Sequence, residues 1–477
     1  MATISERSSR AQARNGWLHD PFLFTPSAFF TWSLAVSYNM VEYACLSIII
    51  TFYTKEAMKT HLAEAAIIVC VQDGLASFAA VVLARLTCER SGRRFYAIVF
   101  TTGSYIAGVI MLWSYARQQP QDQERNVPLF LVVSCLFALG KAGYDPVLKS
   151  FLERNLCGSS TERTSPTKRS EIYKNIWVHG AWIVGAIIAI FGFLGLEWPK
   201  VLELSLIVMI SSGLFFLFGS NITEPMSHSS VHEDATTVVP KRGRNAMKWL
   251  LMFSCIAYSL VLATGNIFFQ EQGTKMEPLT IKGKEVRLSL MIVIKSAVNE
   301  ITILIFGLFK ANKKQGITLV RIGSGMVCAI ICCVIAWKVE IERKKEVSDK
   351  GPKTSVAWLF PHYVLLGLVE GLAQSGLEEL FGNDYDENER LRNPGKLSKE
   401  MVSCVGKFLG IPCIVIVRRW FKNFDKDQSR LDRYYFMLAT LSGAFFFIYV
   451  NVAFLFNKVV SDAAEDEGSN GIAKAQR

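Results

Sequence analysis

The chain has 477 residues, of which 51% are hydrophobic and 12% aromatic, and its formal net charge is +11. This hydrophobic content, together with a positive mean hydropathy of +0.27, excludes an ordinary soluble enzyme or binding domain. The positive charge does not indicate nucleic-acid binding, because the lysines and arginines lie in short segments at the ends of apolar stretches, where anionic lipid attracts them.

Twelve apolar stretches follow one another along the chain. A helix needs ~20 residues to cross ~30 Å of hydrocarbon, and it satisfies its own backbone hydrogen bonds there. We predict these helices at 29–53, 65–86, 95–114, 128–150, 175–196, 200–219, 246–268, 287–309, 317–338, 355–381, 401–418 and 433–456. The sequence therefore predicts an all-α membrane protein that crosses the lipid bilayer twelve times.

The longest polar interruption, residues 220–245, falls between the sixth and seventh helices. Its prolines and its Ser/His/Thr-rich middle are typical of a solvated connector. We therefore predict two six-helix bundles, one over 29–219 and one over 246–456, with a cytoplasmic linker between them. Residues 1–28 would form a cytoplasmic N-terminal segment and residues 457–477 a cytoplasmic tail.

The distribution of basic residues predicts the orientation. In the first half, Lys and Arg concentrate before the first helix and after the second and fourth, so we expect both termini to be cytoplasmic. The second half does not follow this bias, since the basic runs 343–345 and 418–419 fall in loops predicted outside. The glycosylation triplet that starts at Asn221 lies in the predicted cytoplasmic linker, so we expect it to be unmodified. The plasma membrane and an internal, vacuolar membrane both remain open.

The eleven cysteines give no sign of a metal site or of a disulfide framework. They lie mostly in apolar stretches, where cysteine behaves as a small hydrophobic residue. No paired histidines and no nucleophile constellation occur at membrane depth. We therefore expect neither enzymatic activity nor a cofactor or metal.

Ionisable residues inside the predicted helices are the candidate functional residues. Each such residue costs at least ~2.5 kcal/mol near the bilayer centre, so it needs a partner, a wet cavity or a function. The candidates for a substrate or proton pathway are Glu42, Asp73, Lys141, Asp145, His179, Lys295, Glu300, Glu370 and Glu379, with Glu378 and Lys407 as further charges. Because they lie on several helices of both bundles, we predict a cavity between the bundles.

Five short segments of the second half carry a resemblance to a known family. They are Phe268–Met276, Gly316–Met326, Gly367–Glu370, Gly376–Phe381 and Leu431–Ala439. In order and spacing they resemble elements of the plant nitrate and peptide transporter family, within the proton-dependent oligopeptide transporters of the major facilitator superfamily. The resemblance implies two six-helix bundles and a secondary transporter that moves nitrate, a short peptide or a plant metabolite by alternating access.

The first half departs from that family's chemistry. Its members carry Glu-x-x-Glu-Arg in the first helix, whose carboxylates take the coupling proton. An ungapped register places Tyr38 and Asn39 on the Glu-Arg pair, whereas a gapped register places Glu42 on the glutamate and Tyr43 on the arginine. Asp145 stands where the family has a lysine in the fourth helix. Proton coupling is therefore in doubt, and the alternative function is a non-transporting membrane sensor or regulatory protein that keeps the transporter fold.

Glu42 and Lys141 form the pair that the resemblance singles out. In the ungapped register each lies one helical turn, ~6 Å, from its aligned motif position, and both shifts point toward the exterior. One interpretation is that Glu42 and Lys141 form an interhelical ion pair one turn nearer the exterior than the family's pair. The other is that Lys141 and Asp145, four residues apart on one helix, neutralise each other. The two can coexist in a network.

The remaining charges leave several partners open. Lys295 and Glu300 lie ~140° apart around one helix, so we do not expect them to satisfy each other. The resemblance favours Glu379 as a cavity-facing residue and Lys295 as a gate or substrate partner. Two interpretations are open for Asp73 and His179. Each is either a hydrogen-bonded residue that stabilises its helix or a residue that takes part in proton transfer. The expected partners are a small solute or anion, the lipid and, if Glu42 or Asp73 titrates, protons.

Overall fold

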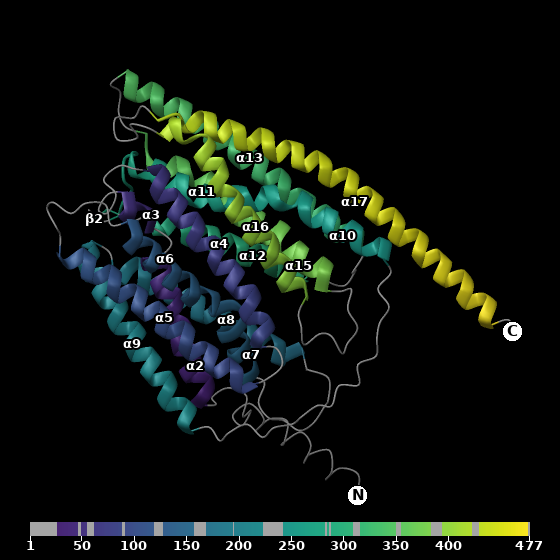
Figure 1. The fold of residues 1–477 in the computed structure, drawn as a ribbon, viewed down its shortest axis with the longest axis horizontal. Helices are drawn as coiled ribbons and strands as arrows, with labels where there is room; N and C mark the ends of the chain where they lie inside the picture. The colour runs from purple at the N-terminus through teal and green to yellow at the C-terminus, as the bar shows by residue number, and fades with distance from the viewer. Residues whose placement is uncertain are drawn as a thin grey trace, which may run out of the picture.

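Twelve helical spans make up the described part of the chain (Figure 1). The computed structural model describes residues 26–45, 49–54, 62–87, 91–118, 127–156, 168–193, 195–222, 242–281, 284–285, 288–308, 315–349, 354–382, 394–421 and 429–475. The predicted N-terminal segment, residues 1–28, lies almost entirely outside these ranges.

The first six spans form the N-terminal bundle. They are α2 (Pro26–Ala44) with α3 (Ile49–Phe52), α4 (Leu62–Thr87), α5 (Ser91–Gln118), α6 (Val127–Ala142) with the π-helical η3 (Tyr144–Lys149) and α7 (Ser150–Leu156), α8 (Lys168–Ile187) with the π-helical η4 (Ile188–Gly192), and α9 (Trp198–Ile222). Within this bundle α2 packs on α8 and α9, and α6 packs on α4 and α5.

The second six spans form the C-terminal bundle. They are α10 (Arg242–Ser254) with α11 (Ile256–Thr274), α12 (Ser289–Leu308), α13 (Gln315–Ser348), the 3-10 turn η5 (Val356–Leu359) with α14 (Phe360–Val369), the π-helical η6 (Glu370–Gln374) and α15 (Ser375–Gly382), α16 (Pro394–Ile416) with the 3-10 turn η8 (Arg418–Phe421), and α17 (Leu431–Ala475). A short hairpin of β1 (Thr280–Ile281) and β2 (Lys284–Glu285) joins α11 to α12. Here α13 packs on α14 and α17, and α16 packs on α11 and α15.

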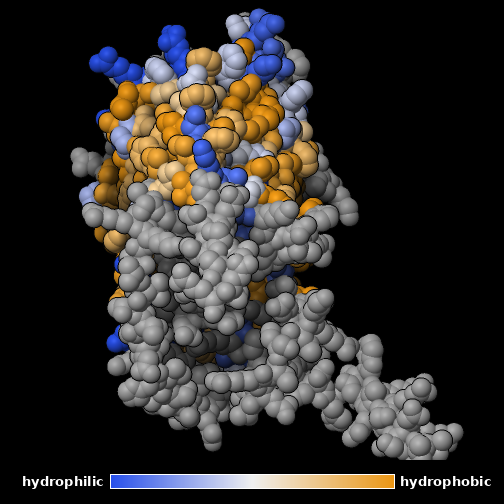
Figure 2. Space-filling view, turned by 90° about the vertical axis from the view of Figure 1, so that its right-hand side faces the viewer, coloured by the Kyte–Doolittle hydropathy of each residue, from blue (hydrophilic) through white to orange (hydrophobic). Residues whose placement is uncertain are grey.

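The outer surface has the apolar character of a membrane protein. Nine helices of the described ranges are long and apolar enough to cross a membrane, and residues 176–192 add a shorter apolar helix. Large apolar side chains such as Phe218, Phe447 and Ile416 are more than 60% exposed, as expected for side chains that face lipid. Figure 2 shows hydrophobic residues over much of the described part of one face, with hydrophilic residues gathered at its upper end. The prediction of an all-α, multi-pass membrane protein is confirmed.

Proline and glycine shape the connection between the fifth and sixth spans. Gly195 has φ 75°, a left-handed conformation that glycine adopts without steric penalty, and it turns the chain after η4. Pro199 then stands in the first turn of α9, where its missing N–H is harmless. The connection between the fifth and sixth spans is therefore only a few residues long.

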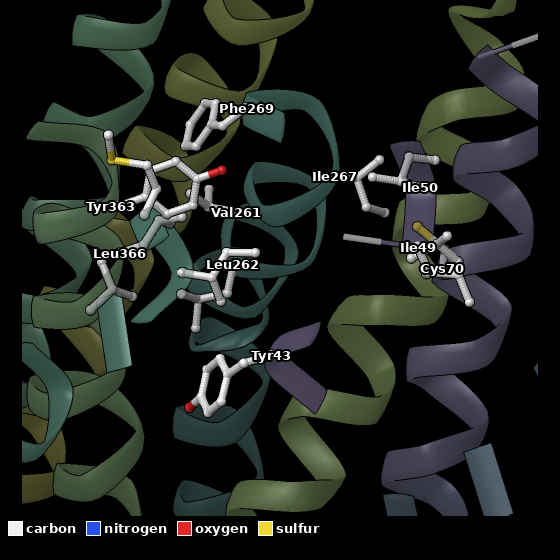
Figure 3. Packing of buried hydrophobic residues seen from close by; sticks show 14 of the residues in the cluster. Tyr43, Ile49, Ile50, Cys70, Val261, Leu262, Ile267, Phe269, Tyr363 and Leu366 are labelled. Carbon is white, nitrogen blue, oxygen red and sulfur yellow. The ribbon is translucent and has the colours of Figure 1, made fainter. Parts of the chain in front are cut away.

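The two bundles meet along α4 and α16 and around α11. Phe408 of α16 lies where a Cβ on Gly74 of α4 would come within 2.9 Å, so the glycine allows close approach of the two helices. Figure 3 shows α11 between the bundles: Phe269 lies near Tyr363 of the C-terminal bundle, whereas Ile267 points toward Ile50 of α3. Among the nine candidate spans of the described residues, the one that contains α11 is the most buried.

Several helix ends differ from the sequence prediction. α13 ends at Ser348 instead of 338, α16 begins at Pro394 instead of 401, and α8 begins at Lys168 instead of 175. The first and last spans differ as well. The first span was predicted as one helix over 29–53, but α2 ends at Ala44 and a separate helix, α3, begins at Ile49. The last span continues as α17 to Ala475, so most of the predicted tail is helical, and Figure 1 shows its end projecting beyond the bundles. Residues 223–241 of the predicted linker lie outside the described ranges, so the bundle boundaries stay predictions.

Candidate functional site

A polar cavity of about 150 Å³ lies between the two bundles. Helices α2, η3 and α8 line it from the N-terminal bundle, and α12 lines it from the C-terminal bundle. The lining residues are Asn39, Tyr43, Tyr144, Asp145, Lys149, Val178, His179, Trp182, Ser296, Asn299 and Glu300. Three predicted site residues, Asp145, His179 and Glu300, are therefore brought together on one cavity.

Lys141 of α6 lies between two carboxylates of the N-terminal bundle. Its ammonium group donates to Glu42 Oε1 of α2 at 2.8 Å and to Asp73 Oδ1 of α4 at 3.4 Å. The predicted contact between Glu42 and Lys141 is confirmed, and Asp73 joins it. Lys407 of α16 donates to Ser77 Oγ at 2.8 Å, and its charge also acts on Asp73.

The alternative pairing within the fourth span is not the main one. Lys141 is engaged by the two carboxylates just described, while Asp145 is exposed toward the cavity. Lys149 lies one turn after Asp145 on the same span, and Asp145 lines the cavity together with Asn299 and Glu300 of α12. Asp145 therefore faces the C-terminal bundle rather than the Glu42 pair.

A second buried ion pair stands in the C-terminal bundle. The ammonium group of Lys295 on α12 donates to Glu370 Oε1 of η6 at 2.7 Å and to Asn266 Oδ1 of α11 at 3.4 Å. A Cβ at Gly367 would lie 2.4 Å from the carbonyl oxygen of Lys295, so this glycine lets α14 approach α12 closely. The prediction that Lys295 does not satisfy Glu300 is confirmed.

Polar contacts connect the bundles across the cavity. His179 Nδ1 of α8 lies 3.1 Å from Glu300 Oε2 of α12. The hydroxyl of Tyr43 on α2 donates to Ser296 Oγ of α12 at 2.9 Å, and Trp182 Nε1 of α8 donates to the same tyrosine hydroxyl. These two groups of contacts connect side chains that lie on opposite bundles.

Both bundles place a π-helical segment beside this region. η3 carries Asp145 and contains Pro146, which has no N–H to donate to the helix ladder. η6 begins at Glu370, which pairs with Lys295. π-helical segments interrupt regular helices and occur often at functional sites. In both bundles the interruption coincides with a candidate carboxylate.

The tenth span, which contains η6 and α15, directs its three glutamates to different partners. Glu379, which the resemblance favoured as cavity-facing, lies 3.1 Å from Arg321 Nη1 of α13 and is not among the cavity-lining residues. Arg321 Nη2 also donates to the carbonyl of Gly371 at 2.7 Å. Glu378 lies 3.8 Å from Lys399 Nζ at the start of α16. Through its ion pair with Arg321, Glu379 connects α15 to α13.

The positions aligned with the missing glutamate–arginine pair hold neutral residues with structural bonds. The hydroxyl of Tyr38 lies 3.1 Å from Thr102 Oγ1, and Asn39 Nδ2 donates to the hydroxyl of Tyr144 at 2.6 Å. These bonds connect α2 to α5 and to η3. Tyr38 and Asn39 therefore hold helices together and carry no ionisable group that titrates near neutral pH.

Several cavity residues were not identified from the sequence as site candidates. Ser296 and Asn299 lie on the same face of α12 as Glu300, and Lys149 lies one turn after Asp145. Each lies one helical turn from a candidate charge, Ser296 from Glu300, Asn299 from Lys295 and Lys149 from Asp145, and this spacing was the available signal. It was weak, because a serine, an asparagine or a lysine near a helix end is common without any such role.

Comparisons with known proteins give relatives for the sequence and for the fold. No protein-family model matches the chain. It is 32% identical to Protein NRT1/PTR FAMILY 5.10 of Arabidopsis thaliana over 237 residues, which cover 44% of this chain and 40% of that protein. It is 24% identical to Protein NRT1/PTR FAMILY 5.12 of the same plant across 90% of this chain and 92% of that protein. The alignment with the first of these relatives thus spans less than half of its length.

Solved structures match over nearly the whole chain. The crystal structure of an auto-inhibited POT family peptide transporter is similar with a TM-score of 0.67, covering 90% of this chain and 97% of that one at 14% identity. The structure of the POT family transporter PepTSo gives a TM-score of 0.65 at 13% identity. At these identities the similarity applies to the fold, and it agrees with the two-bundle arrangement.

Proposed function

Because the chain is a divergent member of the plant nitrate and peptide transporter family, we propose that it is a secondary transporter that carries a small polar solute through the cavity between its bundles. The relatives support only the general class of function, secondary transport. They do not identify the substrate. We assign the chain no catalytic activity.

The observation that carries the proposal is the cavity whose walls belong to both bundles. Tyr43 and His179 come from the N-terminal bundle, and Ser296 and Glu300 come from the C-terminal bundle. Alternating access needs a site of this kind, because each bundle must hold the solute while it moves relative to the other. Polar groups on both walls replace water around the solute during the passage.

The contacts at the two ends of the interface suggest how the bundles alternate. Arg418 Nη2, after α16, lies 2.7 Å from Glu64 Oε1 at the start of α4. In the predicted orientation this ion pair is at the outer end, while Asp145 and Lys399 lie on opposite bundles nearer the inner end. We propose that the conformation faces inward, and that outward opening breaks the Glu64–Arg418 pair and brings Asp145 to Lys399.

Proton coupling would use the cluster around Lys141. One ammonium group there is shared by two carboxylates, at 2.8 Å for Glu42 and 3.4 Å for Asp73. When Lys141 moves to one carboxylate, the other loses its counter-ion and has a stronger tendency to take a proton. We propose that Glu42 and Asp73 exchange Lys141 during the cycle, and that the released carboxylate is the proton carrier.

Uptake by the full-length protein in proteoliposomes tests the proposal. The panel contains nitrate, a dipeptide and small amines, each with and without an imposed pH gradient. We expect uptake of at least one solute, its loss in Ser296→Leu, which fills the cavity, and its retention in Ser211→Leu, a matched change on the exposed face of α9. A well-folded protein that transports none of the panel, or equal uptake by both variants, would contradict the proposal.

A non-transporting sensor is the second candidate. Tyr38 and Asn39 favour it, because they replace an ionisable pair with neutral residues that only connect helices. A sensor would bind a solute without moving it. Saturable binding to the purified protein, combined with no uptake in proteoliposomes, is the result that would select this candidate.

A further inference from the structure

We propose that the cavity selects a compact organic cation, an amine or quaternary ammonium ion, with Glu300 as its counter-ion. This inference rests on the proposed function, since it names the substrate class of that same cavity. It differs from the nitrate and anion class that the resemblance implies. The argument depends on the charge at the bundle interface, the side chains around Glu300 and the size of the cavity.

Of the residues that the structure describes, Glu300 is one of two carboxylates that line the cavity, and it contacts a histidine, whereas Glu42, Asp73 and Glu370 contact lysines. The ammonium group of Lys141 contacts Glu42 and Asp73, and that of Lys295 contacts Glu370. Lys149, the one lysine among the described cavity-lining residues, lies one turn after Asp145 on the same span. Glu300 has the imidazole of His179 at 3.1 Å. A neutral imidazole can donate one hydrogen bond, but it leaves the negative charge uncompensated.

A carboxylate inside a membrane protein needs compensation for its charge. An uncompensated charge is costly at membrane depth, and such residues commonly mark the path of a substrate or ion. The side chain of Glu300 is 25% exposed, so solvent screens its charge only in part. A cation that enters the cavity would supply the missing charge, whereas an anion would meet the repulsion of Glu300.

The side chains around Glu300 also suit a cation. Tyr43, Tyr144 and Trp182 line the same cavity. Lys149 also lines it, but Asp145 lies one turn before it on the same span, so these two opposite charges offset each other and Glu300 adds a further negative charge. Aromatic faces attract ammonium groups through the ring quadrupole, and cages of such rings recognise quaternary ammonium ions. The carboxylate comes from α12 and the three aromatic residues come from α2, η3 and α8. A bound cation would therefore contact both bundles.

Size limits the cation to a compact one. The cavity volume of about 150 Å³ lies below the ~300–1,000 Å³ of pockets that hold drug-sized ligands. His179 Nδ1 already contacts Glu300 Oε2. An ammonium group must therefore displace the imidazole or bind the carboxylate together with it. The hydroxyl of Ser296 and the amide of Asn299 lie on the same helix and can accept hydrogen bonds from the ammonium group or its substituents.

Binding to the purified full-length protein tests the inference. The probes are ethanolamine and choline as cations, ethylene glycol as the uncharged match of ethanolamine, and nitrate as an anion, each titrated while tryptophan fluorescence is followed. We expect the two cations to bind and the other two probes not to bind. Stronger binding of nitrate, or equal binding of ethanolamine and ethylene glycol, would overturn the inference.

Three variants place the cation on Glu300. Glu300→Gln should weaken ethanolamine binding by about ten- to a hundredfold, the ratio for one lost charge-assisted hydrogen bond. Glu378→Gln, a matched change at a glutamate outside the cavity, should leave binding unchanged. His179→Ala should strengthen binding, because it removes the competing imidazole, whereas a purely structural histidine would give weaker binding. Equal binding by Glu300→Gln and the unmodified protein contradicts the assignment.

Uptake separates this inference from the proposed function. Ethanolamine binding that depends on Glu300 without any uptake would leave the cation site standing and would contradict transport. Uptake of nitrate or a dipeptide, with no binding of either cation, would leave transport standing and would overturn the cation site. Melting temperatures of the three variants near that of the unmodified protein confirm that the comparison concerns folded protein.

Discussion

Removing the ammonium group of Lys141 should destabilise the protein more than removing either of its carboxylate partners. Lys141→Met removes the cation that Glu42 and Asp73 share and leaves only the more distant charge of Lys407 near Asp73, whereas Glu42→Gln leaves Lys141 in contact with Asp73. The asymmetry follows from the geometry, since one ammonium group serves two carboxylates. A simple two-residue pair would show no such difference.

The expected magnitude lies between those of buried and surface pairs. Breaking a fully buried ion pair costs about 3–5 kcal/mol and a surface pair at most about 1 kcal/mol. The relative side-chain exposures of Lys141 and Glu42 are 35% and 27%, so solvent screens the pair partly. We expect losses of about 2–3 kcal/mol for Lys141→Met and about 1 kcal/mol for Glu42→Gln. The triple variant, in which Glu42→Gln and Asp73→Asn are added to Lys141→Met, should recover most of the unfolding free energy that Lys141→Met loses.

Equilibrium unfolding in mixed micelles, with an increasing fraction of SDS, measures these free energies. The readout is the coupling free energy from a double-mutant cycle between Glu42 and Lys141, with Lys149→Met as the control for loss of a lysine on the same span. Additive effects of Glu42 and Lys141, together with strong coupling between Lys141 and Asp145, would refute the reasoning. That outcome would assign the lysine to a local pair within the fourth span.

Three further predictions concern the C-terminal bundle and the two ends of the interface. Arg321→Lys should lower the free energy of unfolding by about 1–3 kcal/mol, because lysine cannot reach a carboxylate and a carbonyl in the geometry of the guanidinium fork; unfolding in mixed micelles measures it. Glu64→Arg should shift the protein toward the outward-open state and Arg418→Glu should restore the balance, because the ion pair joins the bundles at the predicted outer end; labelling of a single outer-end cysteine reports the change. Cysteines at Asp145 and Lys399 should crosslink only when the outer end opens, since the two residues lie on opposite bundles nearer the inner end.

Each of these tests has an outcome that contradicts it. Arg321→Lys with an unchanged unfolding free energy would show that the bond to the Gly371 carbonyl adds nothing. Equal labelling of the Glu64→Arg variant and the unmodified protein would show that the outer ion pair does not hold the closed end. Crosslinking of the Asp145–Lys399 cysteine pair in the Glu64–Arg418 closed state would show that the inner end does not separate.

The helices themselves were predictable because a bilayer imposes a length and a composition on each span. The predicted spans 65–86 and 200–219 agree with α4 and α9 within a few residues. The end of α2 at Ala44 was not predictable, since the residues before and after it are similarly apolar. Hydropathy measures how much apolar surface a segment offers, and it contains no information on where a helix is interrupted.

The pairing of charges was predictable only in part. Glu42 and Lys141 were connected because both are displaced by one turn from their aligned positions. Glu370 and Lys295 are separated by 75 residues along the chain, and no periodicity relates them. Their contact depends on the close approach of α12 and α14 that Gly367 allows, which is a tertiary property. Helix-wheel angles excluded wrong partners on one helix, but they could not choose the right partner on another.

The length of α17 turns a small rotation of the C-terminal bundle into a large movement. Its 45 residues span ~68 Å at 1.5 Å per residue. Lys344 pairs with Asp432 at its start, and Tyr449 donates to the carbonyl of Leu319, so the first half of this helix is fixed to α13. A rigid tilt of ~10° about its start would move the far end by ~12 Å on this length. A fluorophore attached at this end would therefore move much farther than one at the cavity. Energy transfer to a second fluorophore on the N-terminal bundle would report the rocking motion.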